Sequence, residues 1–252
     1  RLQGVGINAI SSVAQSDMTG FQVSGLASIT GRHASGIQLG GIANVAGANA
    51  NGVMLSGLMN VAGNRANGIQ ISGLGNIARN TSRGVTIGGL MNLADDQAQG
   101  LQIAGLANIA GKSQSGIAIG GLMNVSAEKT DGAQIASILN ISGGTARGAQ
   151  IAAIGNVGIN VNGMQLSAIS NIAAAKIKGL QLCGAVNIAV ETKNALQVSG
   201  ITNVCQGKLS GIQFAPGNYA GEVSGAQIGL LNLCGGHVKG VQIGIDTHIA
   251  YC

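Results

Sequence analysis

The pattern that decides the fold fills residues 37–132 and reads IQLGGIANVAGANANG (37–52), VMLSGLMNVAGNRANG (53–68), IQISGLGNIARNTSRG (69–84), VTIGGLMNLADDQAQG (85–100), LQIAGLANIAGKSQSG (101–116) and IAIGGLMNVSAEKTDG (117–132). The 16-residue period does not slip within this stretch. A short fixed period is the signature of a solenoid or a repeat array. We number the positions of each repeat 1 to 16, so that Ile37 is position 1 and Gly52 is position 16.

The order of residue types within a repeat predicts strands. Positions 1 and 3 are apolar and flank Gln at position 2, a period of two that is typical of a strand with one buried face. The small residue and Gly at positions 4 and 5 permit a bend, positions 6–10 form a second short strand, and positions 11–16 form a polar turn. A helix is disfavoured because each Gly would cost about 1 kcal/mol. We therefore predict an all-β, parallel β-solenoid of about 16-residue repeats.

Two polar positions recur in register. Stacked coils place like residues over like, about 4.8 Å apart, where one side-chain amide can donate to the next. We predict an Asn ladder at position 8 and a Gln ladder at position 2, both structural. The Asn column includes Asn44, Asn60, Asn76, Asn92, Asn108, Asn124 and Asn140. The Gln column includes Gln38, Gln70, Gln102 and Gln134.

A second period of 32 residues underlies the first, since Met54, Thr86 and Ala118 replace Gln in alternate repeats. One coil could therefore hold one motif or two, and we favour one. Cys205 and Cys234 bear on this choice. A 32-residue coil would stack them within reach of a disulfide, whereas a 16-residue coil would leave them about 10 Å apart, too far to bridge.

The regular repeats extend beyond the opening stretch in both directions. We expect residues 1–20 to form an irregular N-terminal segment or cap, residues 21–211 the regular solenoid, and residues 212–252 irregular C-terminal repeats or a cap. The repeat at residues 149–163 is one residue short. No linker or shift in composition interrupts the series, which indicates one domain.

Composition excludes several classes of protein. Only 8% of residues are charged and 46% are hydrophobic, and 44 of the 252 are Gly. Regularly spaced apolar residues argue against disorder, and the absence of an apolar run of about 18 residues argues against a membrane-spanning chain. The net charge is +5, but aromatic residues make up only 2%. A nucleic-acid partner, which favours cations interleaved with aromatics, is therefore not expected. The repeat-like N-terminus lacks a signal peptide, so we expect a mature or a cytosolic chain.

No motif for catalysis or for cofactor binding occurs. His33, His237 and His248 are isolated, and the only adjacent acids are Asp95 and Asp96. The four cysteines lack the spacing of a zinc site, and we expect Cys183 and Cys205 to be small buried core residues. Thr forms no column, which disfavours ice binding. We predict no enzyme activity, no metal and no cofactor.

The surface carries the remaining functional information. In a strand, positions 7 and 9 cannot share a face with positions 6 and 8, so one apolar face is expected to be exposed. A long apolar stripe marks an interface. We therefore expect self-association into an oligomer or filament.

The motif Gly-x-Gln-Ile-Gly-Leu-x-Asn, at residues 225–232 and in part at 240–244, resembles the short surface-repeat proteins of Bacteroidetes and spirochaetes. More loosely, the chain resembles curlin-type repeats, from which its spacing of six residues between Gln and Asn departs. The first resemblance implies an exported protein of the cell envelope and provides no catalytic residues.

We therefore expect a structural, non-catalytic protein, secreted or at the cell surface, that assembles into fibres or an envelope layer. The alternative is an adhesion module that recognises a glycan or a host protein through the turns at positions 11–15. Those turns offer no aromatic platform for a sugar.

Overall fold

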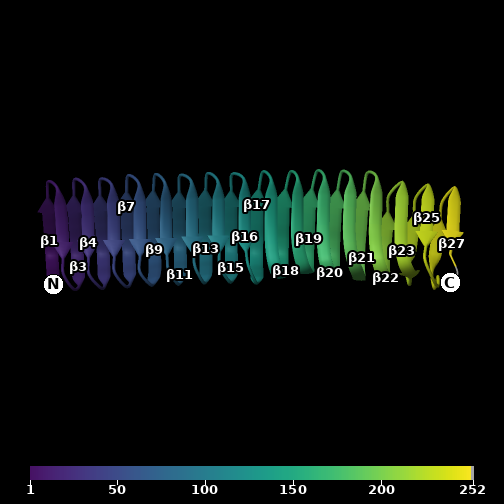
Figure 1. Ribbon diagram of the computed structural model, residues 1–252, viewed down its shortest axis with the longest axis horizontal. Coiled ribbons are helices and arrows are strands. Elements are labelled where there is room, and N and C mark those ends of the chain that lie inside the picture. Colours follow the sequence, from purple (N-terminus) through teal and green to yellow (C-terminus); the bar gives the residue numbers. More distant parts are fainter. Residues whose placement is uncertain (251–252) are drawn as a thin grey trace. The chain divides into compact units, whose positions relative to one another are not determined.

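The computed structural model describes residues 1–250, and among these residues every regular element is a β-strand. The chain divides into unit 1 (Arg1–Ser126) and unit 2 (Ala127–Cys252). Each unit is a parallel β-solenoid with coils of about 16 residues (Figure 1). The predicted fold class is confirmed.

Unit 1 contains a longer and a shorter strand in every coil. The longer strands are β1 (Leu2–Asn8), β3 (Met18–Ser24), β5 (Ala34–Gly40), β7 (Ala50–Ser56), β9 (Arg65–Ser72), β11 (Thr81–Gly88), β13 (Gln97–Ala104) and β15 (Ser113–Gly120). The shorter strands are β2 (Ser11–Ala14), β4 (Ala27–Thr30), β6 (Ala43–Ala46), β8 (Met59–Ala62), β10 (Gly75–Ala78), β12 (Met91–Ala94), β14 (Ala107–Ala110) and β16 (Met123–Ser126). Each pairs with the strand of its own kind in the next coil.

Unit 2 contains five strands of 13 or 14 residues, each of which runs from position 7 of one repeat to position 3 or 4 of the next. All the strands of this unit are β17 (Lys129–Ala136), β18 (Leu139–Ala152), β19 (Gly155–Ser167), β20 (Ser170–Cys183), β21 (Val186–Ser199), β22 (Thr202–Phe214), β23 (Gly217–Val223), β24 (Ala226–Ile228), β25 (Leu231–Cys234), β26 (Val241–Ile243) and β27 (Asp246–Ile249). The short repeat at 149–163 is absorbed by register shifts in β18 and β19, so that Thr145 pairs with Asn160.

The physical coil holds one motif, because pairing partners are 16 residues apart, as in Asn60 with Asn76. The 16-residue coil, which the sequence favoured over a 32-residue coil, is therefore the one observed. Residues 1–20 differ from the irregular segment that was expected. Leu2 of β1 already pairs with Met18 of β3, at the same offset.

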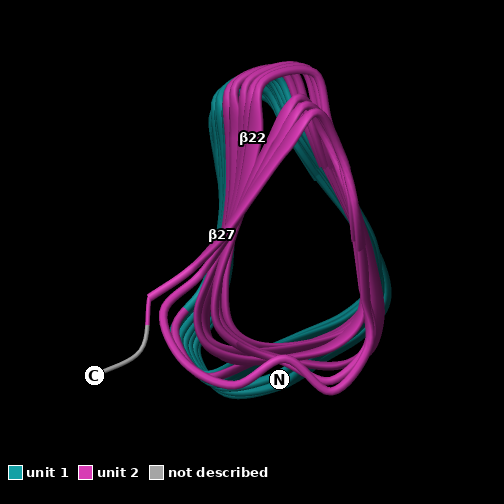
Figure 2. Ribbon diagram, turned by 90° about the vertical axis from the view of Figure 1, so that its right-hand side faces the viewer, with its two compact units in different colours: residues 1–126 teal, residues 127–252 magenta. Residues whose placement is uncertain are grey.

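Every coil has three sides, which Figure 2 shows end-on for each unit. We call positions 1–4 side 1, positions 7–10 side 2 and positions 11–15 side 3. In unit 1 the chain bends at positions 5–6 and 11–12, and again at the Gly of position 16. That Gly has a positive φ, +104° at Gly100, and an added Cβ there would lie 2.2 Å from the carbonyl oxygen of Gly84 in the preceding coil. Only glycine fits this corner without strain.

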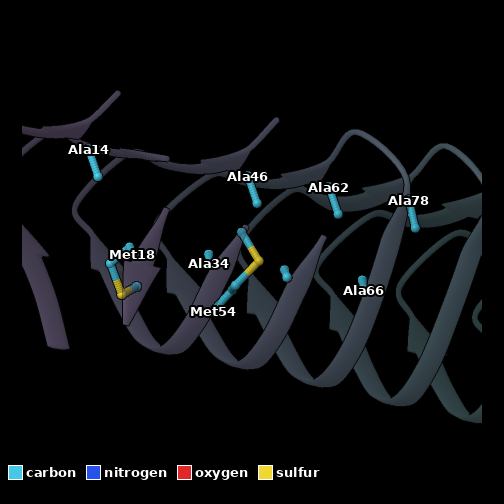
Figure 3. Close-up of a cluster of buried hydrophobic side chains, with 9 residues drawn as sticks. Ala14, Met18, Ala34, Ala46, Met54, Ala62, Ala66 and Ala78 are labelled. Atoms are coloured by element: carbon cyan, nitrogen blue, oxygen red, sulfur yellow. The ribbon is translucent and has the colours of Figure 1, made fainter. Parts of the chain in front are cut away.

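The interior is lined by positions 2, 4, 8, 10 and 14. These positions hold Gln, Asn and small residues, as in Gln38, Gly40, Asn44, Ala46 and Ala50, all of which are buried. Figure 3 shows two rows of such side chains in unit 1, with Ala46, Ala62 and Ala78 at position 10 opposite Ala34 and Ala66 at position 14. In unit 2 larger side chains take part at position 14, namely Val161, Ile177 and Leu209.

The apolar residues of positions 1, 3 and 6 therefore face outward, which corrects the expectation that the apolar face of the first strand is the buried one. Ile212 and Phe214 are 43% and 54% exposed, whereas Gln213 between them is 0% exposed and is hydrogen-bonded to Gln197 and Gln227. The reason is that an amide stacked on its own kind satisfies its hydrogen bonds inside the coil, so burial carries no penalty for an unpaired polar group.

Candidate functional site

The amide ladders bring together the residues that the sequence singled out. In unit 1 the Nδ2 atom of Asn60 donates to Oδ1 of Asn76 at 2.9 Å, and Asn92 donates to Asn108 at the same distance. Each also donates to a backbone carbonyl of the next coil, as Asn60 does to Ile71 at 2.8 Å. The Asn column is a hydrogen-bonded ladder in both units.

The Gln column differs between the units. In unit 2 it is continuous from Gln134 to Gln242, with each Nε2 donating to the Oε1 of the preceding coil. Its direction is opposite to that of the Asn ladder, so the two rows of amide dipoles oppose each other. In unit 1 Met54, Thr86 and Ala118 interrupt the column, and the amide of Gln102 has no hydrogen-bond partner among the described residues.

Cys205 and Cys234 are both buried free thiols. Ala220 lies between them in the column, paired with Cys205 on one side and with Cys234 on the other. This is the arrangement that a 16-residue coil predicts, and the disulfide of the 32-residue alternative is not formed. Cys183 is buried as well, in agreement with its expected place in the core. Burial raises the pKa of the Cys183 thiol, and it raises that of Cys205 to about 11.

The described residues beside these columns do not include a cluster of side chains that could hold a metal ion. Residues 1–250 contain no group of three or more His, Cys, Asp or Glu side chains that could hold a metal ion. Nor does this part of the chain contain a helix long and apolar enough to cross a membrane. The candidate functional feature is therefore the distribution of side chains over the three sides.

Charge is confined to one side of the coil. From Arg1 to Ile245, every Lys, Arg, Asp and Glu occupies positions 11–15, on side 3. Its ion pairs lie there too, as in Arg32 with Asp17 at 2.9 Å and Lys112 with Asp96 at 2.7 Å. These pairs are partly exposed, so each contributes little to stability.

Sides 1 and 2, by contrast, carry no charge over this range and present columns of large apolar side chains. Position 6, at the corner between them, is the most regular column. Its exposed members in unit 1 are Ile10, Leu26, Ile42, Leu58, Leu74, Leu90, Leu106 and Leu122, and those in unit 2 are Ile138, Ile154, Ile169, Ile201, Leu230 and Ile245. Their exposed fraction is 41–67% in unit 1. Position 3 forms a parallel column, with Leu55, Ile71 and Ile119 in unit 1.

An apolar groove lies beside the position 3 column in both units. In unit 1 it has a volume of about 460 Å³, with Leu39, Leu55 and Ile71 as its wall and small residues such as Gly40 and Gly41 as its floor. In unit 2 a groove of about 280 Å³ lies at the same positions, between Phe214, Ile228 and Leu230. The small residues of positions 4 and 5 thus leave a hollow beside the position 3 column.

The direction of the apolar columns is what sequence reasoning missed. A strict alternation of apolar and polar residues does not say which face of the strand points inward, and large aliphatic residues are usually the buried ones. A usable signal was present, however, since up to Ile245 the charged residues avoid eleven of the sixteen positions. Only the inward face of a strand has to be free of charge. Here both alternating faces of the strands on sides 1 and 2 are free of charge, which indicates that one uncharged face lies outside.

Comparisons with family models, with curated proteins and with solved structures found no match to this chain. Function must therefore be argued from the geometry.

Proposed function

We propose that this chain is a structural, non-catalytic repeat protein that assembles laterally through sides 1 and 2. One observation carries the proposal: two sides of each unit are free of charge up to Ile245 and expose columns of Ile, Leu and Val, while side 3 holds the charges. Contiguous apolar surface of this extent is uncommon on a monomer in water and marks an interface.

The geometry suits a second copy of the same chain. Eight longer strands, β1 to β15, follow one another in unit 1. At about 4.8 Å per coil, the columns there extend roughly 34 Å between the first strand and the last. A ridge at position 6 of one copy can enter the groove beside position 3 of another, the interdigitation of identical side chains that seals steric zippers. Side 3 then remains in water.

We place this assembly outside the cell, as a fibre or a layer of the envelope. The support is the resemblance of the Gly-x-Gln repeats to surface-repeat proteins. Protease digestion of intact cells of the source organism tests the location. Cleavage of the chain without lysis is expected, and protection until lysis would contradict it.

Sedimentation velocity over a range of concentrations tests the assembly. The wild-type chain is expected to form oligomers or filaments, and the variant Leu58→Lys/Leu74→Lys/Leu90→Lys is expected to sediment as a monomer of 24.8 kDa. These three side chains are about two-fifths exposed, so lysine can reach water at each position in a monomer.

The control is Gln15→Lys/Asn51→Lys/Gln97→Lys, which adds the same charge at exposed positions of side 3 and should assemble like the wild type. A wild-type chain that stays a monodisperse monomer at high concentration, with no filaments in electron micrographs, would overturn the proposal. So would a chain that remains monomeric and instead floats with neutral phosphatidylcholine vesicles, since the apolar sides would then be covered by lipid.

A further inference from the structure

Side 3 carries a basic hollow in each unit, at the same positions of the repeat. In unit 1, Arg65 and Arg83 line a hollow of about 280 Å³ together with Asn67, Asn80 and Gln97. In unit 2, a hollow of about 170 Å³ is lined by Arg147, Lys176, Lys178 and Lys193 with Asn160 and Asn162. Neither lining includes a carboxylate.

The strand geometry explains why the hollow recurs. Position 14 points into the core, as Ala66, Ser82 and Ile177 do, so its neighbours at positions 13 and 15 point outward as two rows. Register confirms the rows in unit 2, where Arg147 pairs with Asn162 and Asn162 with Lys178. Lys193 continues the second row, because it follows Thr192, the partner of Ile177. The hollow is the space between the two rows.

The cations exceed their acidic partners there. Between residues 132 and 221, Arg147, Lys176, Lys178, Lys193 and Lys208 face a single acid, Glu191. Glu191 pairs with Lys176 at 3.0 Å, and Asp131 lies 3.7 Å from Arg147. Lys178 and Lys193 have no ion pair among the described residues. In unit 1, no acid lies between residues 34 and 94, a range that includes Arg65, Arg79 and Arg83.

We infer that each of these hollows on side 3 binds a segment of a linear acidic polysaccharide. Arg and Lys would hold sulfate or carboxylate groups, and the side-chain amides of positions 13 and 15 would hydrogen-bond the sugar hydroxyls. A single-stranded nucleic acid would stack its bases on aromatic side chains. The described aromatic residues of unit 2, Phe214 and Tyr219, lie on sides 1 and 2 instead. The inference does not rest on the proposed assembly, which uses the other two sides.

Heparin, a linear sulfated polysaccharide, is the probe, and its dissociation constant is measured at several salt concentrations. The wild-type chain should bind it in a salt-dependent manner and should bind fully desulfated heparin at least tenfold more weakly. Arg65→Gln/Arg83→Gln and Lys178→Gln/Lys193→Gln should each weaken binding about tenfold.

The matched control is Arg32→Gln/Lys112→Gln, which changes two cations at position 12, outside both hollows, and lowers the net charge from +5 by the same two charges as either site variant. It should stay within twofold of the wild type. Equal weakening by all three variants would overturn the inference, because attraction would then follow net charge alone. Tighter binding of an oligothymidylate, or of vesicles containing phosphatidylserine, would overturn it in favour of those partners.

Discussion

Asn187 shows what one position 8 side chain does. Its Nδ2 atom donates to the carbonyl oxygen of Gln181 at 3.2 Å, to that of Val198 at 2.8 Å and to Oδ1 of Asn203 at 3.0 Å. Its own Oδ1 accepts from Asn171 at 3.0 Å. A single buried amide therefore ties three successive coils together.

Asn187→Ala should lower the free energy of unfolding by about 2–4 kcal/mol, because several hydrogen bonds are lost and buried partners are left unpaired. Urea denaturation measures the loss. The control is Asn162→Ala, at an exposed position of side 3, which should change stability by less than about 0.5 kcal/mol. Equal effects of the two variants would contradict the structural role of the ladder.

Cys205 makes the stability of unit 2 depend on pH. Burial raises the pKa of this thiol from 9.0 to about 11 in the folded chain. Between these values the unfolded chain loses the proton and the folded chain keeps it, so stability should fall as the pH rises from about 9 to about 11. Cys205→Ala should flatten this part of the stability curve, measured by urea denaturation at several pH values. An unchanged slope would show that other groups cause the decline.

At the scale of the element, the Gln column of unit 1 allows a test of whether a buried polar side chain can stabilise the core better than an apolar one. Met54 lies between Gln38 and Gln70, and the Oε1 atoms of both glutamines lack a hydrogen-bond partner among the described residues. Met54→Gln would donate to Gln38 and accept from Gln70, as consecutive glutamines do in unit 2.

Stability of the Met54→Gln variant, measured by thermal and urea denaturation, should be unchanged or higher by about 1 kcal/mol. Met18→Gln is the matched control, since Met18 is equally buried but stacks between Leu2 and Ala34. It should lose about 1–3 kcal/mol, the cost of burying an unpaired amide. A comparable loss in Met54→Gln would show that the ladder does not extend through this coil.

Much of the element scale was predictable from the sequence. The 16-residue period correctly predicted the length of the coil, and the Asn side chains of position 8 form the predicted ladder. The one-residue deletion at 149–163 appears as a register shift. The direction of the first strand was not predictable from alternation. Ile212 and Phe214 would be a normal core pair, and what reverses them is the amide of Gln213, which is satisfied only when coils stack in register. A hydrogen bond between stacked coils cannot be recognised from the residues of a single repeat.

At the scale of the whole molecule, each unit separates three tasks among its residues. Amides and small residues hold the coils together from inside, sides 1 and 2 expose apolar columns, and side 3 carries the charges. The charged residues are spread along the sequence, but in each unit they lie on one side of the coils. This is why the sequence predicted an interface but not which residues form it.

The apolar columns lie outside the coil, and in the proposed assembly they become covered when copies associate. Site-resolved thiol labelling of Ile71→Cys and Ser72→Cys probes both points, because these neighbours are 39% and 5% exposed. Asn51→Cys on side 3 serves as the exposed control, and mass spectrometry distinguishes each site from the native thiols.

Ile71→Cys is expected to react as fast as Asn51→Cys in dilute solution and to become protected as the protein concentration rises. Ser72→Cys should react slowly at every concentration, and Asn51→Cys rapidly at every concentration. If Ile71→Cys is as slow as Ser72→Cys even in dilute monomer, or if Ser72→Cys is the faster of the two, the apolar columns form the core of the coil and do not lie on its surface.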